Sequence, residues 1–384
     1  MKKVAVVTAT RAEYGLLKPL LTLIDQEPEF TLQLIVTGAH LCKEFGLTYK
    51  EIEKDFKIDA TLPIDLQENT DLSNSLAMAQ LQTQFTLTCK QLQPDLIVIL
   101  GDRYEMLSIA TTATLLHIPI AHIHGGEITQ GAVDDALRHA ITKLSHLHFT
   151  STQHYKKRVI QMGEEPSRVF HVGSLGVEAL LHLPLLNKKE LESVLKFSFK
   201  KKNLLITYHP QTLASMSPQE QIQKVLDALE ELHDTGLIFT KANADAGGVI
   251  INEMIDTFVK KHPNAIAFTS LGQLRYFSTL KYVDGVVGNS SSGILEVPSF
   301  HITTIDIGER QKGRIAAQSV INTPIDTDAI KKAIETLYTP SWQTQLQKVT
   351  NPYFKVNTAL NIIEILKKTH FHTLLTKKFY DLEC

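Results

Sequence analysis

The chain has 384 residues, of which 43% are hydrophobic and 21% are charged, and its formal net charge is −2 at pH 7. This is an ordinary globular composition that fits two domains or one large one, and the near-neutral charge argues against a nucleic-acid partner or a polybasic membrane surface. Apolar runs such as 96–100 are too short to cross a bilayer. The scattered cysteines Cys42, Cys89 and Cys384 have no CxxC spacing, which indicates a reducing, cytoplasmic setting.

The first half of the chain alternates short β-branched runs with helix-length amphipathic stretches, such as 14–26 and 104–117. Runs that are apolar on both faces, such as LIVIL, are typical of parallel strands covered by helices on both sides. Strands are predicted at 4–10, 32–38, 96–101, 118–124, 148–152 and 169–173. The pattern predicts an α/β doubly wound domain of the Rossmann type.

The stretch 182–202 loses this rhythm and is polar and basic, so we predict a connecting surface segment there. The alternation then restarts, with strands predicted at 204–208, 237–241, 265–269, 285–288 and 302–307. We predict two Rossmann-like domains, 1–180 and 181–354, with a helix in 355–384 completing the first. Two such domains facing each other would place the carboxyl ends of both sheets along one cleft, where ligands bind.

The first strand is followed by TATRAEYG, which lacks the GxGxxG spacing of a dinucleotide site, so NAD is not expected. Arg11 stands where a helix begins, beside free backbone N–H groups, and this placement suits an anionic oxygen such as phosphate. The alternative is a helix-capping loop with a solvated arginine.

Two neighbouring strands end in polar residues. LGDRYE places Asp102 and Arg103 after one buried strand, and HIHGGE places His124 and Glu127 after the next. Asp102 alone could be a turn or capping residue. Since the carboxyl ends of parallel strands meet at one edge of a sheet, we predict a site there instead, with the paired glycines allowing a ligand to approach the backbone.

The helix AVDDALRHAITKLSHLH begins with Asp134 and Asp135, which complement the helix dipole. At i,i+4 spacing they can pair with Arg138 and His139, and such ion pairs are the alternative to a catalytic role. The helix follows the strand that ends in HIHGGE, so its first turn is expected to join the same site.

Three stretches of the second half carry polar groups at predicted strand ends. LLITYHP ends in His209, for which packing or surface exposure is the alternative. GNSSSGILE presents Ser290 and Ser291 before a helix predicted near Ile294, and hydroxyl and N–H groups there suit phosphate, with an ordinary cap as the alternative. Glu296 could accept two ribose hydroxyls, and DIGERQKGR adds Arg310. The polar turn KANADAGG follows another strand. Together these features predict a nucleoside diphosphate held by the second domain.

These motifs resemble the hydrolysing UDP-N-acetylglucosamine 2-epimerases of bacterial sialic acid synthesis, the NeuC type, over nearly the whole chain. The carrying motifs are TRAEYG, LGDRYE, HIHGGE, DDALRHAITKLSHLH, VGSLG, YHPQT, NADAGG, GNSSSGILEVPS and IGERQKGR. The resemblance implies that UDP-GlcNAc, or its 2,4-diacetamido-2,4,6-trideoxy analogue, reacts with water to give the free manno-configured sugar and UDP, for sialic or legionaminic acid in capsules or lipopolysaccharides. It also implies a GT-B-type fold and a homo-oligomer, a dimer or a tetramer.

The resemblance also implies residue roles. The residues expected to bind UDP are Arg11, Arg103, His209, Ser290, Ser291, Glu296 and Arg310. The residues expected to line the reacting sugar are Asp102, His124, Glu127, Asp134, Asp135 and Arg138. Relatives with HIEGGE carry a glutamate where this chain has His124, which leaves the acid and base open. Non-hydrolysing relatives tend to show PEEANR and GHRRE; VDDALRH and YHPQT favour the hydrolysing branch.

The expected chemistry is elimination of UDP to a glycal followed by hydration, with Asp102 and the Asp134/Asp135 pair moving protons and His124 and Glu127 positioning water. It needs no metal or nicotinamide cofactor. Three alternatives remain: a glycosyltransferase, a non-catalytic UDP-sugar sensor and a metal-dependent hydrolase. The metal site of the last would use His122, His124, Asp102, Asp135 and His139.

Overall fold

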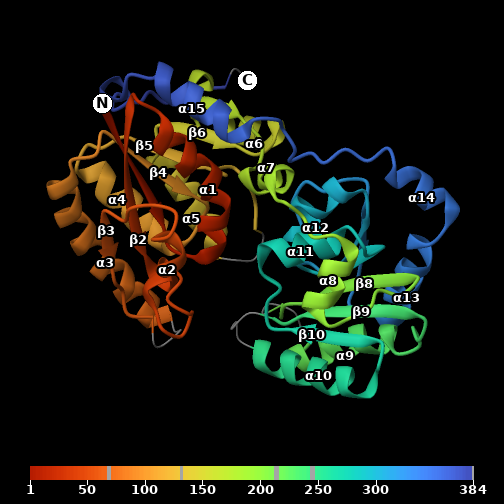
Figure 1. Ribbon diagram of the computed structural model, residues 1–384. Helices are drawn as coiled ribbons and strands as arrows, with labels where there is room; N and C mark the ends of the chain where they lie inside the picture. The colour runs from red at the N-terminus through yellow and green to blue at the C-terminus, as the bar shows by residue number, and fades with distance from the viewer. Residues whose placement is uncertain (67–70, 130–132, 212–215, 243–246, 383–384) are drawn as a thin grey trace. The chain divides into compact units, whose positions relative to one another are not determined.

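The computed structural model describes residues 1–66, 71–129, 133–211, 216–242 and 247–382 (Figure 1). The chain divides into two compact units. The first comprises Met1–Ile128, Ala132–Ala179 and Lys355–Cys384, and the second consists mainly of Leu180–Phe354. Within the described ranges, no helix has both the length and the apolarity to cross a membrane.

The first unit is built on a seven-stranded parallel sheet in the order β3-β2-β1-β4-β5-β6-β7. The strands are β1 (Lys2–Thr8), β2 (Phe30–Thr37), β3 (Ala60–Leu62), β4 (Leu96–Leu100), β5 (Ile120–Ile123), β6 (Leu147–Thr150) and β7 (Val169–His171). Val6 is paired with Leu34 on one side and with Val98 on the other. The strand order reverses between β1 and β4, which is where doubly wound sheets bind ligands.

Helices cover both faces of this sheet. They are α1 (Arg11–Gln26), α2 (Tyr49–Ile52), α3 (Asp71–Leu92), α4 (Tyr104–Leu115), α5 (Val133–Leu144), α6 (Gln153–Gln161), α7 (Leu175–His182) and α15 (Thr358–Lys368). Val4 and Val6 pack with α1 and α15, whereas Ala5 and Val7 pack with α3 and α4, because successive side chains of a strand point to opposite faces. Helix α15 lies beside α1 although it comes from the end of the chain (Figure 1).

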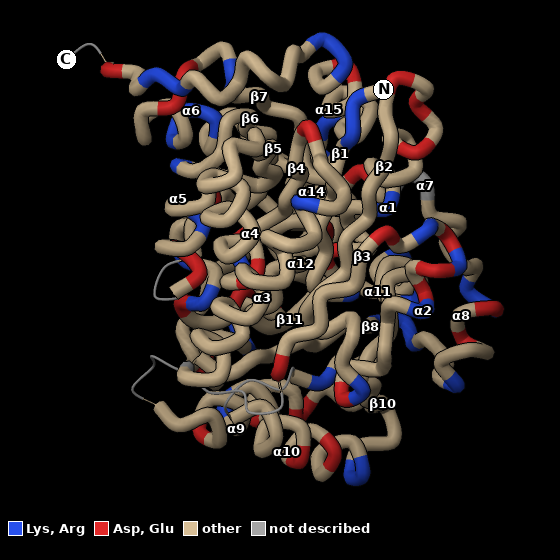
Figure 2. The backbone as a smooth tube through the Cα atoms, turned by 90° about the vertical axis from the view of Figure 1, so that its left-hand side faces the viewer, with Lys and Arg blue, Asp and Glu red and all other residues tan. Residues whose placement is uncertain are grey.

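The second unit has a six-stranded parallel sheet in the order β10-β9-β8-β11-β12-β13. Its strands are β8 (Lys202–Thr207), β9 (Thr235–Thr240), β10 (Ala265–Phe268), β11 (Gly285–Gly288), β12 (Thr303–Ile307) and β13 (Val320–Thr323). Its helices are α8 (Lys188–Leu195), α9 (Pro218–Leu229), α10 (Gly248–Lys261), α11 (Gly272–Leu280), α12 (Ser292–Leu295), α13 (Thr327–Leu337) and α14 (Pro340–Leu346). The central strands of both sheets carry few charges, and the charged residues lie mainly on helices and loops (Figure 2).

Both sheets therefore have the doubly wound order, and the prediction of two Rossmann-like domains is confirmed. The prediction of a connecting surface segment at 182–202 is wrong, because this stretch contains helix α8. Asn187 and Glu190 form a capping box at its start, and Leu191 and Leu195 are buried in the core of the second unit. Two leucines at i,i+4 spacing lie on one face of a helix and can pack that face against a core. The charged residues around them made this pattern hard to recognise in the sequence.

Candidate active site

The first strand is followed by a capped helix, α1, whose Arg11 and Glu13 contact other protein groups. Arg11 is largely exposed and lies 3.2 Å from Glu51. The buried Glu13 accepts hydrogen bonds from the N–H groups of Ala9 and Thr10, at 2.8 and 3.2 Å. Burial raises the pKa of Glu13 to about 7, against the opposing charge of Arg103. Arg103 itself donates to Glu105 at 2.8 Å and lies 3.9 Å from Glu13.

The end of β4 and helix α5 are joined by an ion pair between Asp102 and the buried Arg138. The structure thus brings together two residues that are 36 positions apart and that the sequence analysis placed at one site. Asp135 lies 3.7 Å from His139, as the i,i+4 spacing predicted, and burial lowers the pKa of His139 although Asp135 opposes the shift. Asp134 is half-buried in the first turn of α5.

The turn after β5 carries a second polar group. His124 has a left-handed backbone conformation, with φ of 68°, and its Nδ1 lies 3.1 Å from Oε1 of Glu127. The same carboxylate oxygen accepts a hydrogen bond of 2.6 Å from Ser151, which follows β6. All three side chains are buried. A carboxylate that orients an imidazole, and is itself held by a hydroxyl, is an arrangement suited to proton transfer. The sequence analysis missed Ser151 because the residue lies outside every motif.

The paired glycines of this turn make room for protein atoms. A Cβ at Gly126, where φ is +78°, would lie 2.7 Å from the carbonyl oxygen of Tyr155, and one at Gly125 would lie 3.1 Å from both His122 and Thr142. The structure thus gives these glycines a packing role, whereas the sequence analysis predicted close approach of a ligand.

In the second unit, the end of β8 is tied to the end of β11 by the side chain of Asn289. Its Oδ1 accepts from the N–H of His209 and its Nδ2 donates to the carbonyl of His209, both at 2.8 Å. The backbone carbonyl of Asn289 accepts from Arg310 at 3.2 Å and from Gln311 at 2.9 Å. The sequence analysis placed Asn289 in a motif without giving it a role. It links two of the predicted UDP-binding residues, His209 and Arg310.

The helix after the serine run begins at Ser292, two residues before the predicted start near Ile294. Helix α12 has a single turn, and a 3-10 helix at Val297–Phe300 follows it, with Pro298 near its start. Ser290 and Ser291 are half-buried at the start of α12, and Glu296 follows its end. Tyr276 donates to Ser292 at 2.9 Å and so anchors the turn. Residues 243–246 of the predicted polar turn lie outside the described part of the chain.

One buried acid in this unit was missed. Burial raises the pKa of Asp306, on β12, to about 7, although Arg310 and Arg314 oppose the shift. Asp306 precedes by four residues the arginine that the sequence analysis assigned to UDP.

The two histidines of the HxH motif have separate neighbours. Nε2 of His122 lies 2.7 Å from the carbonyl oxygen of Gly101, while His124 faces Glu127. Over the residues that the structure covers, no three His, Cys, Asp or Glu side chains are grouped as metal ligands would be.

Comparison with known proteins gives matches over the whole chain. The sequence model of a family described as UDP-N-acetylglucosamine 2-epimerase matches residues 22–367. A Campylobacter jejuni protein named GDP/UDP-N,N'-diacetylbacillosamine 2-epimerase (hydrolyzing) is 45% identical over 99% of both chains. Polysialic acid biosynthesis protein P7 of Escherichia coli is 41% identical over 100% of this chain and 99% of its own. A UDP-N,N'-diacetylbacillosamine 2-epimerase (hydrolyzing) of Legionella pneumophila is 34% identical over 98% and 99%.

Solved structures share the fold at lower identity. The complex of Staphylococcus aureus MnaA with UDP superposes with a TM-score of 0.78 at 18% identity and covers 100% of both chains. The UDP-GlcNAc 2-epimerase of Neisseria meningitidis bound to UDP-GlcNAc gives a TM-score of 0.74 at 18% identity, over 96% of this chain and 100% of its own.

Proposed function

The chain belongs to the UDP-N-acetylglucosamine 2-epimerase family, as its motifs predicted, and on this premise we propose that it is a hydrolysing 2-epimerase of UDP-2-acetamido sugars. It converts such a UDP-sugar and water to UDP and the free sugar with inverted configuration at C2. The observation that carries this proposal is 45% identity over 99% of both chains to a hydrolysing 2-epimerase.

Of the two substrates that the motifs left open, we favour UDP-N,N'-diacetylbacillosamine, the 2,4-diacetamido-2,4,6-trideoxy sugar. The relative at 34% identity is named for this substrate, and the relative at 45% identity is named for the GDP or UDP form of the same sugar. UDP-GlcNAc is the second candidate, supported by the relative at 41% identity that is named for polysialic acid biosynthesis.

In the first step a carboxylate takes the C2 proton while the bond between C1 and the UDP oxygen breaks, which leaves a 2-acetamidoglucal and UDP. The proton becomes acidic only as C1 gains oxocarbenium character. Asp102 and the Asp134/Asp135 pair are the proposed proton carriers. The guanidinium of Arg138, paired with Asp102, fixes this carboxylate and favours its charged form.

In the second step the oxygen of water adds to C1 and a proton is delivered to C2 from the opposite face. His124 is the proposed base for the water, because Glu127 holds Nδ1 of its ring and leaves Nε2 on the other side of the imidazole. An imidazole with a carboxylate partner can thus take the place of the glutamate of HIEGGE relatives.

We assign UDP to the second unit. Ser290 and Ser291 supply hydroxyl groups and Glu296 is the proposed ribose acceptor. Arg310 and His209, which share Asn289, are the proposed diphosphate contacts, together with Arg11 and Arg103 of the first unit. The three arginines stabilise the charge that develops on the departing UDP.

We further propose domains at 1–180, completed by 355–384, and 181–354, a cytoplasmic location in keeping with the scattered cysteines, and a homo-oligomer, dimer or tetramer. Exposed leucines on adjoining helices support association: Leu76 and Leu87 of α3 and Leu115 of α4 are 62%, 59% and 81% exposed. Light scattering should give a mass of at least two chains, and a monomer at all concentrations would refute this part of the proposal.

The test is incubation of the pure protein with each UDP-sugar separately, with UDP release followed enzymatically and the free sugar identified by NMR. We expect UDP and the manno-configured 2,4-diacetamido sugar, with a higher kcat/KM than for UDP-GlcNAc. A preference for UDP-GlcNAc would reverse the choice of substrate. UDP release only when an acceptor alcohol is added would indicate a glycosyltransferase, and binding without UDP release would indicate a sensor.

A further inference from the structure

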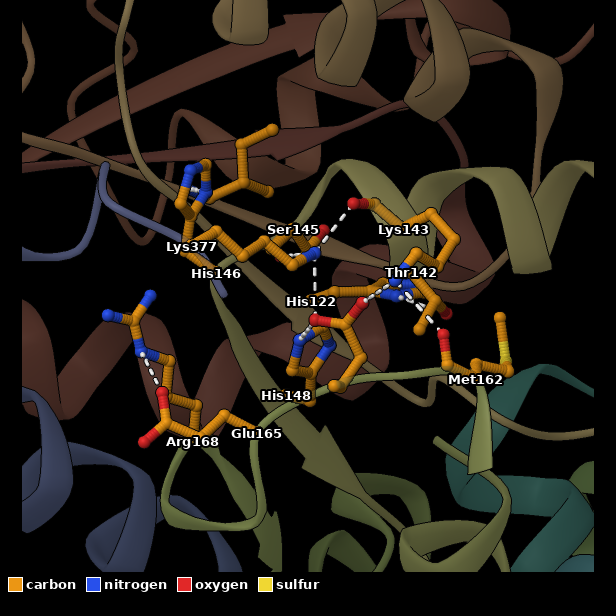
Figure 3. Close-up of polar contacts among 12 residues, drawn as sticks. His122, Thr142, Lys143, Ser145, His146, His148, Met162, Glu165, Arg168 and Lys377 are labelled. Carbon is orange, nitrogen blue, oxygen red and sulfur yellow. Dashed lines mark hydrogen bonds and ion pairs between the residues drawn. The ribbon is translucent and has the colours of Figure 1, made fainter. Parts of the chain in front are cut away.

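A buried histidine behind the candidate site connects the two elements that carry the Asp102–Arg138 ion pair. His122, on β5, is 0% exposed. Its Nε2 lies 2.7 Å from the carbonyl oxygen of Gly101, at the end of β4, and its Nδ1 lies 3.3 Å from the hydroxyl of Thr142 on α5. Figure 3 shows the His122 ring and Thr142 side by side.

The hydrogen-bond partners fix the state of the ring. A carbonyl oxygen only accepts, so Nε2 carries the hydrogen and Nδ1 is an acceptor that faces the Thr142 hydroxyl. Burial lowers the pKa of His122 to about 3, and the nearby His148 and Arg138 add to this effect. The ring is therefore neutral near pH 7.

Each residue that the His122 ring contacts is a direct neighbour of one member of the Asp102–Arg138 ion pair. Gly101 immediately precedes Asp102 in the chain, and the Thr142 hydroxyl, whose single hydrogen can go to Nδ1 of His122 or to the carbonyl of Arg138, lies 2.9 Å from that carbonyl oxygen. The backbone of Gly125 packs closely against the same two side chains, since a Cβ added at Gly125 would lie 3.1 Å from both His122 and Thr142. The imidazole thus holds the strand end and the helix in one register.

We propose that His122 is a positioning residue for the reaction: it fixes the distance between the turn that carries Asp102 and the helix that carries Arg138. This inference rests on the proposed function, because it concerns the placement of a carboxylate assigned there to proton transfer. His122 itself is buried with both nitrogens facing protein atoms, so it acts through Asp102 and does not touch the sugar.

Two substitutions separate the role of Nε2 from that of the ring as a whole. In His122→Gln the side-chain amide nitrogen takes the place of Nε2 and can still donate to Gly101. In His122→Asn the amide is one carbon shorter, takes the place of Nδ1, and leaves the Gly101 carbonyl without this donor. His146→Asn is the matched control. His146 is also buried, and its Nδ1 accepts a hydrogen bond of 3.2 Å from the backbone N–H of Ile120. Ile120 begins β5, at the opposite end of the strand from the candidate site.

The experiment measures kcat and KM for UDP release, the affinity for UDP by calorimetry, and Tm, in all three variants. We expect His122→Asn to lower kcat by roughly 10- to 100-fold, because small displacements of a catalytic group have effects of that size. Affinity for UDP should stay within about twofold, since the proposed UDP contacts lie mainly in the other unit. His122→Gln should recover most of kcat, and His146→Asn should lower Tm as much as His122→Asn with kcat nearly unchanged.

Equal kcat in wild type and His122→Asn would overturn the inference while leaving the proposed function standing. Equal losses of kcat in His122→Asn and His146→Asn would also overturn it, because the effect would then reflect general destabilisation. If the wild-type enzyme releases no UDP from either UDP-sugar, the proposed function fails, and this role falls with it.

Discussion

At the scale of single residues, the candidate site of the first unit contains a half-buried carboxylate, Asp102, and a buried imidazole, His124, with different partners. Asp102 pairs with a guanidinium, whereas His124 faces a carboxylate that Ser151 holds. A paired guanidinium favours the charged carboxylate, and an imidazole beside a carboxylate can accept and return a proton. Two groups in different surroundings can divide the two proton transfers of the proposed reaction.

Replacing Asp102 by Asn tests the first of these groups. The amide keeps the shape but cannot take the C2 proton, so we expect kcat to fall by roughly a thousandfold or more. UDP should still bind with an affinity within about threefold of wild type, as measured by calorimetry. Near-normal turnover would show that another group removes the proton.

Replacing Ser151 by Ala tests the second group. The change removes a hydrogen bond of 2.6 Å to Glu127, and the loss of a bond to a charged group should lower kcat by roughly 10-fold. Ser145→Ala is the control, because Ser145 is equally buried and donates to the carbonyl of Ile141. Steady-state kinetics should show a loss for Ser151→Ala alone, and a similar loss for both variants would speak for general destabilisation.

At the scale of elements, the sequence predicted the central strands because β-branched runs bounded by turns carry a strong signal. It predicted less well where the signal is short or polar, as in α8, which buries only Leu191 and Leu195 of its own residues. The parallel topology was enough to predict that the residues at the strand ends lie at one site, but it did not predict which side chains they pair with. Arg138 has Asp134 at i−4 as its neighbour in the sequence pattern, and only the packing of α5 against α4 and β5 brings it to Asp102.

The turn after β5 gives a prediction about stability. Gly126→Ala would place a Cβ 2.7 Å from the Tyr155 carbonyl at a φ of +78°, and we expect a loss of about 3 kcal/mol in the free energy of unfolding. Gly46 has a φ of +86° but nothing within 4 Å of an added Cβ, so Gly46→Ala should cost only about 1 kcal/mol. Denaturant titration measures both, and equal losses would show that the close approach at Gly126 has no effect on stability.

At the scale of the whole chain, hydrogen bonds join the C-terminal segment to residues of the first unit that precede it by about 200 positions in the sequence. Arg168 donates to the carbonyls of Leu374 and Thr376, and Lys377 donates to those of Lys143 and Ser145. Lys143, Ser145 and Lys377 lie close together in Figure 3. Both lysines also form ion pairs with the buried Glu164, whose carboxylate lies 2.6 Å from Lys143 and 2.7 Å from Lys377. Single-sequence periodicity contains no signal for such long-range contacts, so this cluster could not be predicted.

This cluster gives a prediction about pH. Burial opposes the charge of Glu164, but His148, Lys143 and Lys377 hold its pKa at about 2, below its usual 4.5. A lowered carboxyl pKa adds stability that is present above pH 4.5 and is lost as pH falls towards 2. Glu164→Gln should therefore lower the free energy of unfolding by about 2 kcal/mol at pH 7, and by progressively less as the solution becomes more acidic. This loss is smaller than for a fully buried ion pair, because Lys143 is partly exposed to solvent.

Denaturant titrations at several pH values measure this difference. Glu165→Gln is the control, because Glu165 is the more exposed neighbour and lies 3.6 Å from Arg168. A gap between wild type and Glu164→Gln that is the same at pH 7 and in acid would contradict the assigned charge state.

The central claim is that the enzyme breaks the C2–H bond of a UDP-sugar while UDP departs, and NMR of the product formed in heavy water tests it most directly. We predict that the released sugar carries one deuterium at C2 and has the manno configuration, because the proton delivered to the glycal comes from solvent. Released sugar that retains its original hydrogen at C2, with the gluco configuration, would mean simple hydrolysis and would contradict the account.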